Sequence, residues 1–367
     1  MNSGYHCVFA GGTGTVNTMN GGMNWVNGGT GTVSTMNGGV QKVDAGGSGT
    51  ISTMSNGNQT ISSGGTGIIS IMSGGAQDIS SGGKATINDM RGGIQYVVDA
   101  GTGIINSMTS GIQWISFGGT GAVDNMNDGI QYVRAGTGTI IGMENGIQNV
   151  DSGGSGVVGT MNSGIQNISS GGTGTIRTMI DGKQSIFGGG TSLNTTVYGG
   201  SQYISSGGSV SNTIITGGTQ LVLDGASAVN TTLNSGVAEM VFDTAIVSDL
   251  TMAGGKYFIG VQGNYKISGK FKFTGGIFDM TESSQGVVTG GRYDNLTIDN
   301  LQQGGGTFFI DTDLASETNS DKLEITNAEA GSTYYVQVKD ASLTNNTPVL
   351  GEKKLLLITD ASKNAIF

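Results

Sequence analysis

Charged side chains are the first candidates for chemistry in this chain, because hydrolytic and lyase sites need carboxylates or basic groups that converge on neighbouring segments. Residues 1–240 contain only 6 Lys or Arg and 11 Asp or Glu. Asp124 and Asp128 lie at opposite ends of one expected turn, and Asp89 and Arg91 flank another. We interpret both pairs as solvated turn residues, and we predict no catalytic site.

The remaining reactive residues lie near the two ends of the chain. Asp311, Asp313 and Asp321 are close in sequence, and we predict a structural role for them at strand edges rather than catalysis. His6 stands beside Cys7, but no third ligand or orienting group is recognisable for a metal or a nucleophile. With a single Cys the chain cannot form an internal disulfide, and no metal or cofactor is predicted.

Glycine-rich segments such as GGTGTV suggest three other kinds of site. A phosphate-binding loop would need a following helix and a Gly-Lys-Ser/Thr, and neither is present. A calcium-binding nonapeptide repeat would need Asp where this chain has Thr or Ile. Regular Thr-Gly-Thr segments are typical of ice-binding solenoids, but substitutions at Ile68, Ile104 and Ala122 interrupt the array. Ice binding therefore stays a minor alternative.

Composition excludes several classes of protein. Gly accounts for 70 of 367 residues and Pro for one, which indicates many tight turns. The net charge is −10, and no basic cluster exceeds Lys353-Lys354, so a nucleic-acid partner is not expected. No run approaches 18 apolar residues, and the N-terminus lacks the pattern of a signal peptide.

An internal repeat determines the expected fold. A Met recurs every 17 or 18 residues, and Val197, Ile215 and Leu233 continue its column, which gives 13 copies within residues 11–240. The Met positions are Met19, Met36, Met54, Met72, Met90, Met108, Met126, Met143, Met161 and Met179.

Each copy reads approximately GGTGTV-x-x-M-x-x-G-x-Q-x-V-x-x. Its two short apolar runs are rich in β-branched residues and bounded by Gly, Ser and Asn, which predicts strands rather than a helix. Two strands cannot bury their own apolar side chains, so successive copies must stack. The sequence therefore predicts an all-β parallel β-solenoid of about 18-residue coils, with the recurring Ser-Ser-Gly-Gly at a corner of the coil.

The second apolar run of each copy predicts both an interior ladder and an exposed stripe. A Gln stands two residues before its aliphatic residue from Gln41 to Gln220, so strand alternation places both on the inner face. We predict an amide ladder there; a bulge would instead turn Ile inward and Gln outward. The residues flanking Gln in the middle copies form a candidate interface, which we call the aromatic stripe: Ile94, Tyr96, Ile112, Trp114, Ile130 and Tyr132.

Domain organisation follows from changes in this pattern. Residues 1–240 form the regular Gly-rich β-helix of about 13 coils, and residues 241–302 keep a looser coil pattern. Residues 303–367 change to alternating strands with charged turns. A solenoid end exposes an open core and unpaired strand edges, so we expect this segment to be a C-terminal β cap.

Two features resemble the passenger regions of AIDA-type self-associating autotransporter adhesins. The first is the repeat itself, as in GGTGTV…MNSGIQNISSGG. The second is the last segment, where Ser-Asp-Lys-Leu, an Ala-Gly before Tyr-Val, and Leu-Leu-Leu-Ile-Thr before a final Phe resemble an autochaperone cap. The resemblance covers essentially the whole chain. It implies a right-handed β-helix on the surface of a Gram-negative bacterium, with a signal peptide and a membrane barrel that lie outside this chain.

The resemblance also implies a function. Such passengers mediate autoaggregation, biofilm formation or host-cell adherence, so the implied partners are the same protein on neighbouring cells or a host receptor. The expected alternative is a carbohydrate-active β-helix enzyme, a lyase or a hydrolase. Some members are O-glycosylated by a cytoplasmic glycosyltransferase, and by position the candidate hydroxyls are Ser62, Ser63, Ser80, Ser81, Ser169, Ser170, Ser205 and Ser206.

Overall fold

The computed structural model describes residues 1–240, 244–260, 263–281, 293–316, 319–340, 342 and 355–367. The chain divides into two compact units, residues 1–178 and 179–367. The boundaries predicted at residues 240 and 302 stay a prediction. Within the described ranges, no helix has the length and apolar character needed to span a bilayer.

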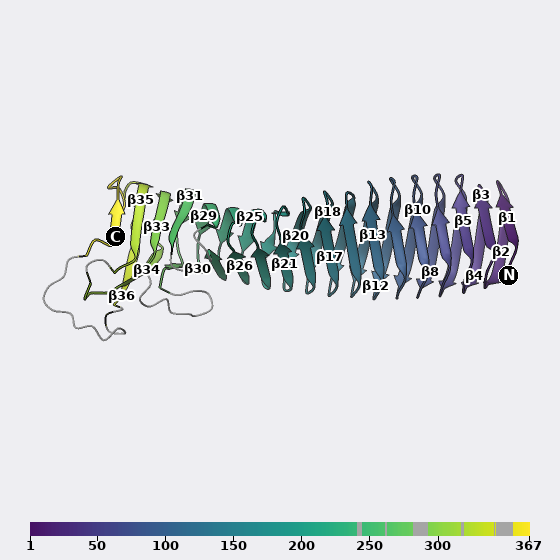
Figure 1. The fold of residues 1–367 in the computed structure, drawn as a ribbon, viewed down its shortest axis with the longest axis horizontal. Coiled ribbons are helices and arrows are strands. Elements are labelled where there is room, and N and C mark those ends of the chain that lie inside the picture. Colours follow the sequence, from purple (N-terminus) through teal and green to yellow (C-terminus); the bar gives the residue numbers. More distant parts are fainter. Residues whose placement is uncertain (241–243, 261–262, 282–292, 317–318, 341, 343–354) are drawn as a thin grey trace. The chain divides into compact units, whose positions relative to one another are not determined.

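Each coil of the first unit contributes one strand to each of two parallel sheets (Figure 1). Sheet 1 contains β1 (Tyr5–Phe9), β3 (Met23–Asn27), β5 (Val40–Asp44), β7 (Asn58–Ile61), β9 (Ala76–Ile79), β11 (Ile94–Val97), β13 (Ile112–Ser116), β15 (Ile130–Arg134), β17 (Ile147–Asp151) and β19 (Ile165–Ile168). Sheet 2 contains β2 (Thr13–Met19), β4 (Thr30–Met36), β6 (Ser48–Met54), β8 (Thr66–Met72), β10 (Lys84–Met90), β12 (Thr102–Met108), β14 (Thr120–Met126), β16 (Thr137–Met143), β18 (Ser155–Met161) and, reaching the unit boundary, β20 (Thr173–Met179). The predicted parallel β-solenoid is confirmed, and it matches a right-handed β-helix.

The second unit has the same two-sheet construction. One sheet contains β21 (Lys183–Ile186), β24 (Ser201–Ile204), β26 (Thr219–Val222), β28 (Val237–Met240), β30 (Lys256–Ile259), β32 (Ile277–Asp279), β34 (Thr307–Thr312) and β36 (Tyr335–Asp340). The other contains β22 (Thr191–Leu193), β23 (Thr196–Val197), β25 (Ser209–Ile215), β27 (Ser227–Leu233), β29 (Ile246–Met252), β31 (Asn264–Phe273), β33 (Asn295–Gln302), β35 (Lys322–Ala328) and β37 (Ile358–Asp360). The described strands of the predicted cap continue the parallel pairing, since β36 pairs with β34 and β37 with β35.

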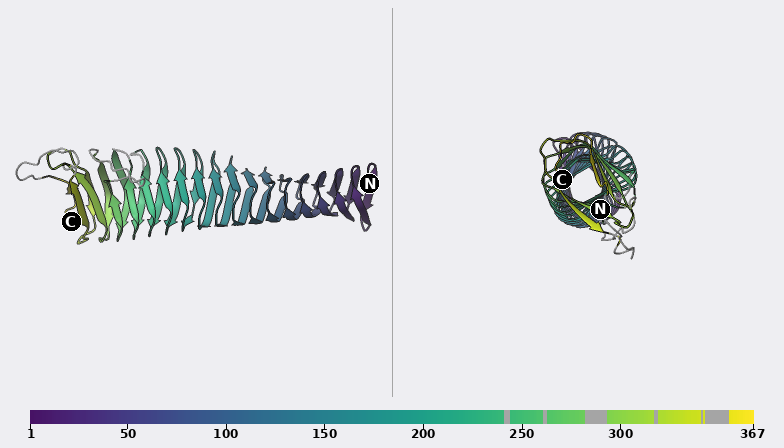
Figure 2. Two further views of the ribbon diagram at one scale, coloured as in Figure 1. Left: turned by 90° about the horizontal axis from the view of Figure 1, so that it is seen from below. Right: turned by 90° about the vertical axis from the view of Figure 1, so that its left-hand side faces the viewer.

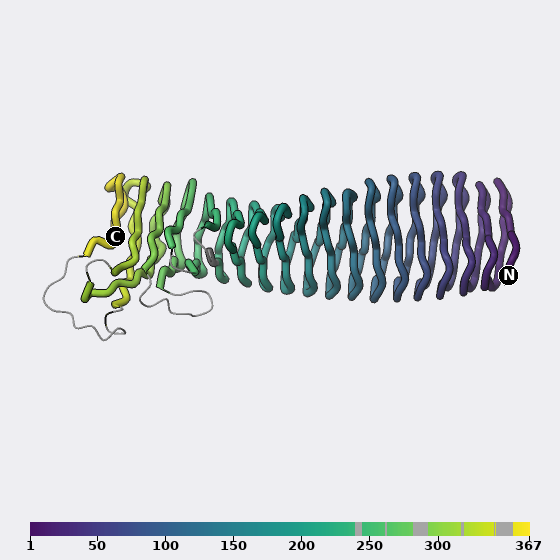
Figure 3. The backbone as a smooth tube through the Cα atoms, viewed as in Figure 1, coloured from purple at the N-terminus to yellow at the C-terminus, as the bar shows by residue number. Residues whose placement is uncertain are grey.

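The core of the first unit lies between its two sheets. Met90 is in register with Met72 and Met108, and every Met of this column is fully buried. The predicted aliphatic columns are buried as well. In Figure 3 the backbone follows nearly the same path from coil to coil in this unit. Because burying one such side chain contributes about 1.5–3 kcal/mol, stability accumulates coil by coil.

The Ser-Ser-Gly-Gly corner is a tight turn between the two sheets. Ser63 and Gly64 have φ of 50° and 74°, and the N–H of Gly65 donates to the carbonyl of Ser62 at 2.9 Å. Positive φ at both central residues is the requirement of a type I′ turn. A Cβ on Gly65 would lie 2.8 Å from the carbonyl oxygen of Val43, so this position excludes a side chain. The end-on view in Figure 2 shows the coils closing around the interior at such corners.

The predicted amide ladder fills the interior beside the aliphatic core. Gln59 Nε2 donates to Gln41 Oε1 at 2.7 Å, and the same bond recurs at 2.6–2.7 Å through to Gln166. All these Gln side chains are buried, so Gln faces inward and the alternative register is wrong. Gly67 makes room for the ladder, because a Cβ there would lie 2.9 Å from Gln59 Oε1.

The core of the second unit changes along the chain. A Gln ladder runs from Gln184 through Gln202 to Gln220, at 2.6 and 2.7 Å. Further along, aromatic rings replace Met and Ile, with the rings of Phe273 and Phe308 5.0 Å apart. Tyr334 is buried and packs 5.7 Å from the ring of Phe367.

Candidate interaction surface

Three neighbouring strands of sheet 1 in the first unit position the aromatic stripe. The register of β11, β13 and β15 aligns Tyr96 with Trp114 and Trp114 with Tyr132. The Ile at the start of each strand is aligned in the same way. Since the intervening Gln points inward, these side chains point to solvent, as the alternation predicts.

Two of the aromatic rings on this face pack against each other. The rings of Trp114 and Tyr132 lie 4.8 Å apart with an interplanar angle of 38°. Tyr96 is 38% exposed, and the other members of the stripe are half-buried against one another. On the flanking strands the same column holds Asp78 and Asn149, so polar residues border the aromatic patch on both sides. An apolar centre with a polar rim is the usual anatomy of a protein interface.

The predicted glycosylation sites all lie at the corners described above. The second serine of each pair is exposed and the first is half-buried: the exposed ones are Ser63, Ser81, Ser170 and Ser206, and the half-buried ones are Ser62, Ser80, Ser169 and Ser205. Ser63 and Ser81 occupy equivalent corners of successive coils, so their hydroxyls repeat along one edge of the first unit. An exposed hydroxyl on a turn is accessible to a modifying enzyme.

The charged residues of the first unit do not converge. Arg91 pairs with Asp89 at 2.6 Å on the surface, and the hydrogen bond that Arg91 donates to this carboxylate, together with the carboxylate charge, raises the pKa of Arg91. Asp128 accepts from the N–H of Gly129 at 2.7 Å, the pattern of a turn residue. Asp124 is half-buried on sheet 2.

Asp294, Asp311 and Asp321 of the second unit lie close together, in a structural role. Asp321 is fully buried, and its two oxygens accept the backbone N–H groups of Asp294 and Asp311 at 2.8 and 2.7 Å. Burial raises the pKa of Asp321 to about 8, although the two backbone donors act in the opposite direction. Asp313 Oδ1 accepts the N–H of Ala315 at 2.9 Å. The Asp313 contact fixes a turn after β34, and Asp321 joins separate segments at the ends of β33, β34 and β35. The sequence predicts a structural role for these residues.

The N-terminal pair, His6 and Cys7, lies on β1. His6 Nδ1 lies 3.4 Å from Asn24 Oδ1, and the Cys7 thiol is exposed. In the part of the chain that the structure describes, no three His, Cys, Asp or Glu side chains are grouped to hold a metal ion.

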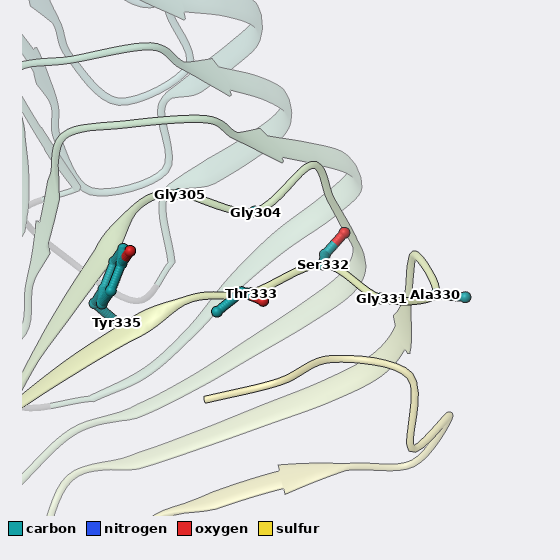
Figure 4. A pocket seen from close by; sticks show the side chains of 7 residues that line it. All are labelled: Gly304, Gly305, Ala330, Gly331, Ser332, Thr333 and Tyr335. Atoms are coloured by element: carbon teal, nitrogen blue, oxygen red, sulfur yellow. The ribbon is translucent and has the colours of Figure 1, made fainter.

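A cavity of about 390 Å³ lies near the end of the second unit (Figure 4). Tyr335, Thr333 and Ser332 line one side of it, and Gly304 and Gly305 face them. A Cβ on Gly304 would lie 2.2 Å from the carbonyl oxygen of Thr333, so the glycine allows the two segments to approach. Among the described residues that line this cavity, none is an Asp, Glu, His, Lys or Arg.

A groove on the second unit contains polar residues that the sequence analysis missed. Asn194, Asn212 and Asn230 have φ of 54°, 58° and 56°, and they bend successive strands at the same position. Asn212 Nδ2 donates to Asn194 Oδ1 at 3.1 Å, and Asn230 Nδ2 to Asn212 Oδ1 at 2.7 Å. The signal was available in the sequence as Asn-Thr pairs 18 residues apart.

Comparison with known proteins identifies one structural relative in particular. No protein-family profile matches the sequence, and no curated protein matches it either. The crystal structure of a TibC-catalysed, hyper-glycosylated fragment of TibA, its residues 55–350, matches with 36% sequence identity and a TM-score of 0.55. The match covers 62% of this chain and 88% of the TibA fragment. The two chains therefore share a β-helix fold.

Proposed function

We propose that this chain is the surface-displayed passenger of a bacterial adhesin, and that it acts by contact rather than by catalysis. The observation that carries the proposal is the aromatic stripe, a stacked apolar patch on a solvent-facing sheet. Monomeric surfaces seldom maintain such a patch without a partner. The 36% identity to the TibA fragment supports the assignment to a β-helical adhesin.

The proposed partner is a second copy of the chain on a neighbouring cell, with a host-surface receptor as the other partner. Two copies related by a two-fold axis would bring the same patch of each together, which is a closed, isologous contact. Tyr96, Trp114 and Tyr132 would form its centre, because aromatic side chains supply most of the binding energy at protein interfaces. Repetition of small contacts along the coils would add avidity.

We also propose that the exposed corner hydroxyls are O-glycosylated by a protein glycosyltransferase. The TibA fragment carries glycans added by TibC. Among the candidate serines of this chain, Ser63, Ser81, Ser170 and Ser206 are the exposed ones. Intact-mass measurement after co-expression with TibC tests this, since each added sugar raises the mass by a fixed step. Replacing these four serines by glycine would remove most of the added mass.

A non-enzymatic role fits the distribution of charge. A glycoside hydrolase needs two carboxylates facing one bound sugar, and a lyase needs a base with charge stabilisation. In the first unit the charged side chains form dispersed surface pairs, such as Arg91 with Asp89 and Arg134 with Asp151. The buried carboxylates of the second unit hold backbone N–H groups. Among these carboxylates of the described residues, the partners are thus basic side chains or backbone N–H groups.

Sedimentation across a hundredfold concentration range, at two salt concentrations, tests self-association. Reversible dimerisation is expected, and Trp114→Ser should weaken it by at least about fivefold, or about 1 kcal/mol. Phe117→Ser is the matched control, because Phe117 is 74% exposed at a corner of the same coil, outside the stripe. If the chain stays monomeric, self-association is refuted and the host receptor becomes the proposed partner. If both variants weaken dimerisation equally, the stripe is not part of the interface.

A further inference from the structure

We propose that the second unit binds an acidic polysaccharide in a groove that crosses one sheet over six successive coils. Each coil contributes one level of the groove. The groove is bounded by two columns of side chains. The first column runs through Asn194, Asn212, Asn230, Asp249, Lys270 and Asn300, and the second through Thr196, Ile214, Thr232, Thr251, Lys272 and Gln302. This site is separate from the aromatic stripe of the first unit.

Backbone geometry makes the groove. The residue of the first column is left-handed at four successive levels, with φ between 53° and 58°, and Gly269 continues the bend at 67°. The next residue then points inward: Thr213 and Thr231 are buried and donate to Oε1 of Gln202 and Gln220. These levels are thus bent at or next to the first column, and the second column lies two residues further along the chain.

Two adjoining cavities occupy the space between the columns. One encloses about 300 Å³ between the Asn194–Asn230 part of the first column and the facing Thr and Ile residues. The other encloses about 550 Å³ from Asn230 to Gln303. Both are lined by Asn230, so they adjoin at that residue and together follow the two columns. Five spacings between levels give a length of about 24 Å, which accommodates several pyranose rings in a row.

The lining matches the hydroxyl groups of sugars. An amide can make up to four hydrogen bonds, and the ladder uses one donor and one acceptor of Asn212, whose side chain is exposed. The half-buried Thr232 and Thr251 add hydroxyls on the opposite side. Ile214, 42% exposed between the threonines, offers an apolar contact for one ring face.

Two lysines at one level specify an acidic sugar. Lys270 and Lys272 both belong to β31, are exposed, and lie on opposite sides of the groove. Neither has an ion-pair partner in the described part of the chain, whereas Lys266 of the same strand pairs with Asp299 at 3.0 Å. Asp249 lies one level away, and its Oδ1 accepts the backbone N–H of Lys270 at 3.1 Å. A carboxylate between the two lysines would meet two charged donors.

Other extended ligands fit less well. A peptide would bind such a sheet through unpaired strand edges, but β25, β27, β29 and β31 are each paired on both sides. A nucleic acid would need cations along the whole groove, and here they stand at one level in a chain of net charge −10.

Calorimetric titration of the whole chain with hyaluronan oligosaccharides of four to ten sugars tests the proposal, with dextran oligosaccharides as the uncharged probe. We expect hyaluronan to bind more tightly than dextran. Affinity should increase with length until the groove is filled and then level off. Lys270→Gln with Lys272→Gln should weaken hyaluronan binding by about tenfold or more, because both charged donors are lost.

Two further variants keep the test specific. Lys256→Gln with Lys266→Gln makes the same change in net charge outside the groove, and it should alter the affinity less than twofold. Thr232→Val with Thr251→Val keeps the side-chain shape and should weaken both probes. The proposal is overturned if the two lysine double variants bind alike, if affinity rises with length without a plateau, if single-stranded DNA competes as well as hyaluronan, or if neither sugar binds.

Discussion

Replacing Gln113 by Ala interrupts the amide ladder of the first unit near its middle. Gln113 Nε2 donates to Gln95 Oε1 at 2.7 Å, and its Oε1 accepts from Gln131 Nε2 at 2.6 Å. After the substitution Gln95 Oε1 loses its ladder donor, and Gln131 Nε2 loses its ladder acceptor and keeps only a 3.3 Å contact to the carbonyl of Thr139. All three Gln side chains are fully buried, so water does not replace the lost partners.

The magnitude follows from these two orphaned groups and the space left behind. A buried polar group without its partner costs about 1–3 kcal/mol. Two such groups and a small cavity together give a loss of about 3–5 kcal/mol in the free energy of unfolding. Gln113→Met preserves most of the volume but none of the hydrogen bonds, and it should therefore recover less than half of the loss.

Gln41→Ala is the matched control. Gln41 is just as buried, but it accepts a ladder bond only from Gln59, and its own Nε2 donates to the carbonyl of Gly31 at 3.3 Å. One orphaned ladder group instead of two should make this variant about 1–2 kcal/mol less destabilising than Gln113→Ala.

Urea unfolding followed by fluorescence is a suitable assay, because Trp114 adjoins the substituted residue. Hydrogen exchange adds spatial resolution: protection should fall most at β11, β13 and β15, since a solenoid loses stability locally. Equal losses for Gln113→Ala and Gln41→Ala, or a loss below about 1 kcal/mol for Gln113→Ala, would refute the ladder as a stabilising network.

Three further predictions concern pH and backbone. Because burial raises the pKa of Asp321 from 3.8 to about 8, the folded chain holds a proton that the unfolded chain has released. The free energy of unfolding should thus fall by about 1.4 kcal/mol per pH unit from about pH 5 to about pH 8. Asp321→Asn should flatten this pH dependence, and denaturant titrations that give the variant the same slope as the parent chain would contradict the prediction. Gly64→Ala should lower the free energy of unfolding by about 1–2 kcal/mol, because φ of residue 64 is 74° and the open space around it leaves backbone strain as the only cost. Ser63→Gly, at φ of 50°, should leave the stability unchanged or raise it. If thermal unfolding ranks the two variants in the opposite order, turn strain is excluded as the cause. Gly67→Ala should lower the free energy of unfolding by about 1–3 kcal/mol through overpacking, since the new Cβ would lie 2.7 Å from Ile61. An unchanged melting temperature would show that the ladder can shift to make room.

The sequence alone was sufficient for the coil and its register. Once a period of 18 residues is recognised, stacking places each Met on the previous Met and each Gln on the previous Gln. Alternation along the strand then determines which of Gln95 and Tyr96 faces inward, and the structure has the predicted orientation. In a solenoid these decisions depend on local pattern and nearest neighbours, which is why sequence reasoning reaches them.

The groove and the carboxylate cluster needed the tertiary structure. In β12 the buried positions are the second, fourth and seventh, whereas in β25 they are the second, fifth and seventh, and only the left-handed Asn212 explains the difference. Whether an Asn bends a strand depends on what packs beneath the next residue. Likewise Asp321 meets the backbone of Asp294 and Asp311 across separate segments, and its raised pKa arises from burial that no local pattern encodes. The sequence determined the repeating coil because stacking is a local rule, and the tertiary structure alone decided where that coil is bent, hollowed and charged, because those properties depend on side chains from several coils at once.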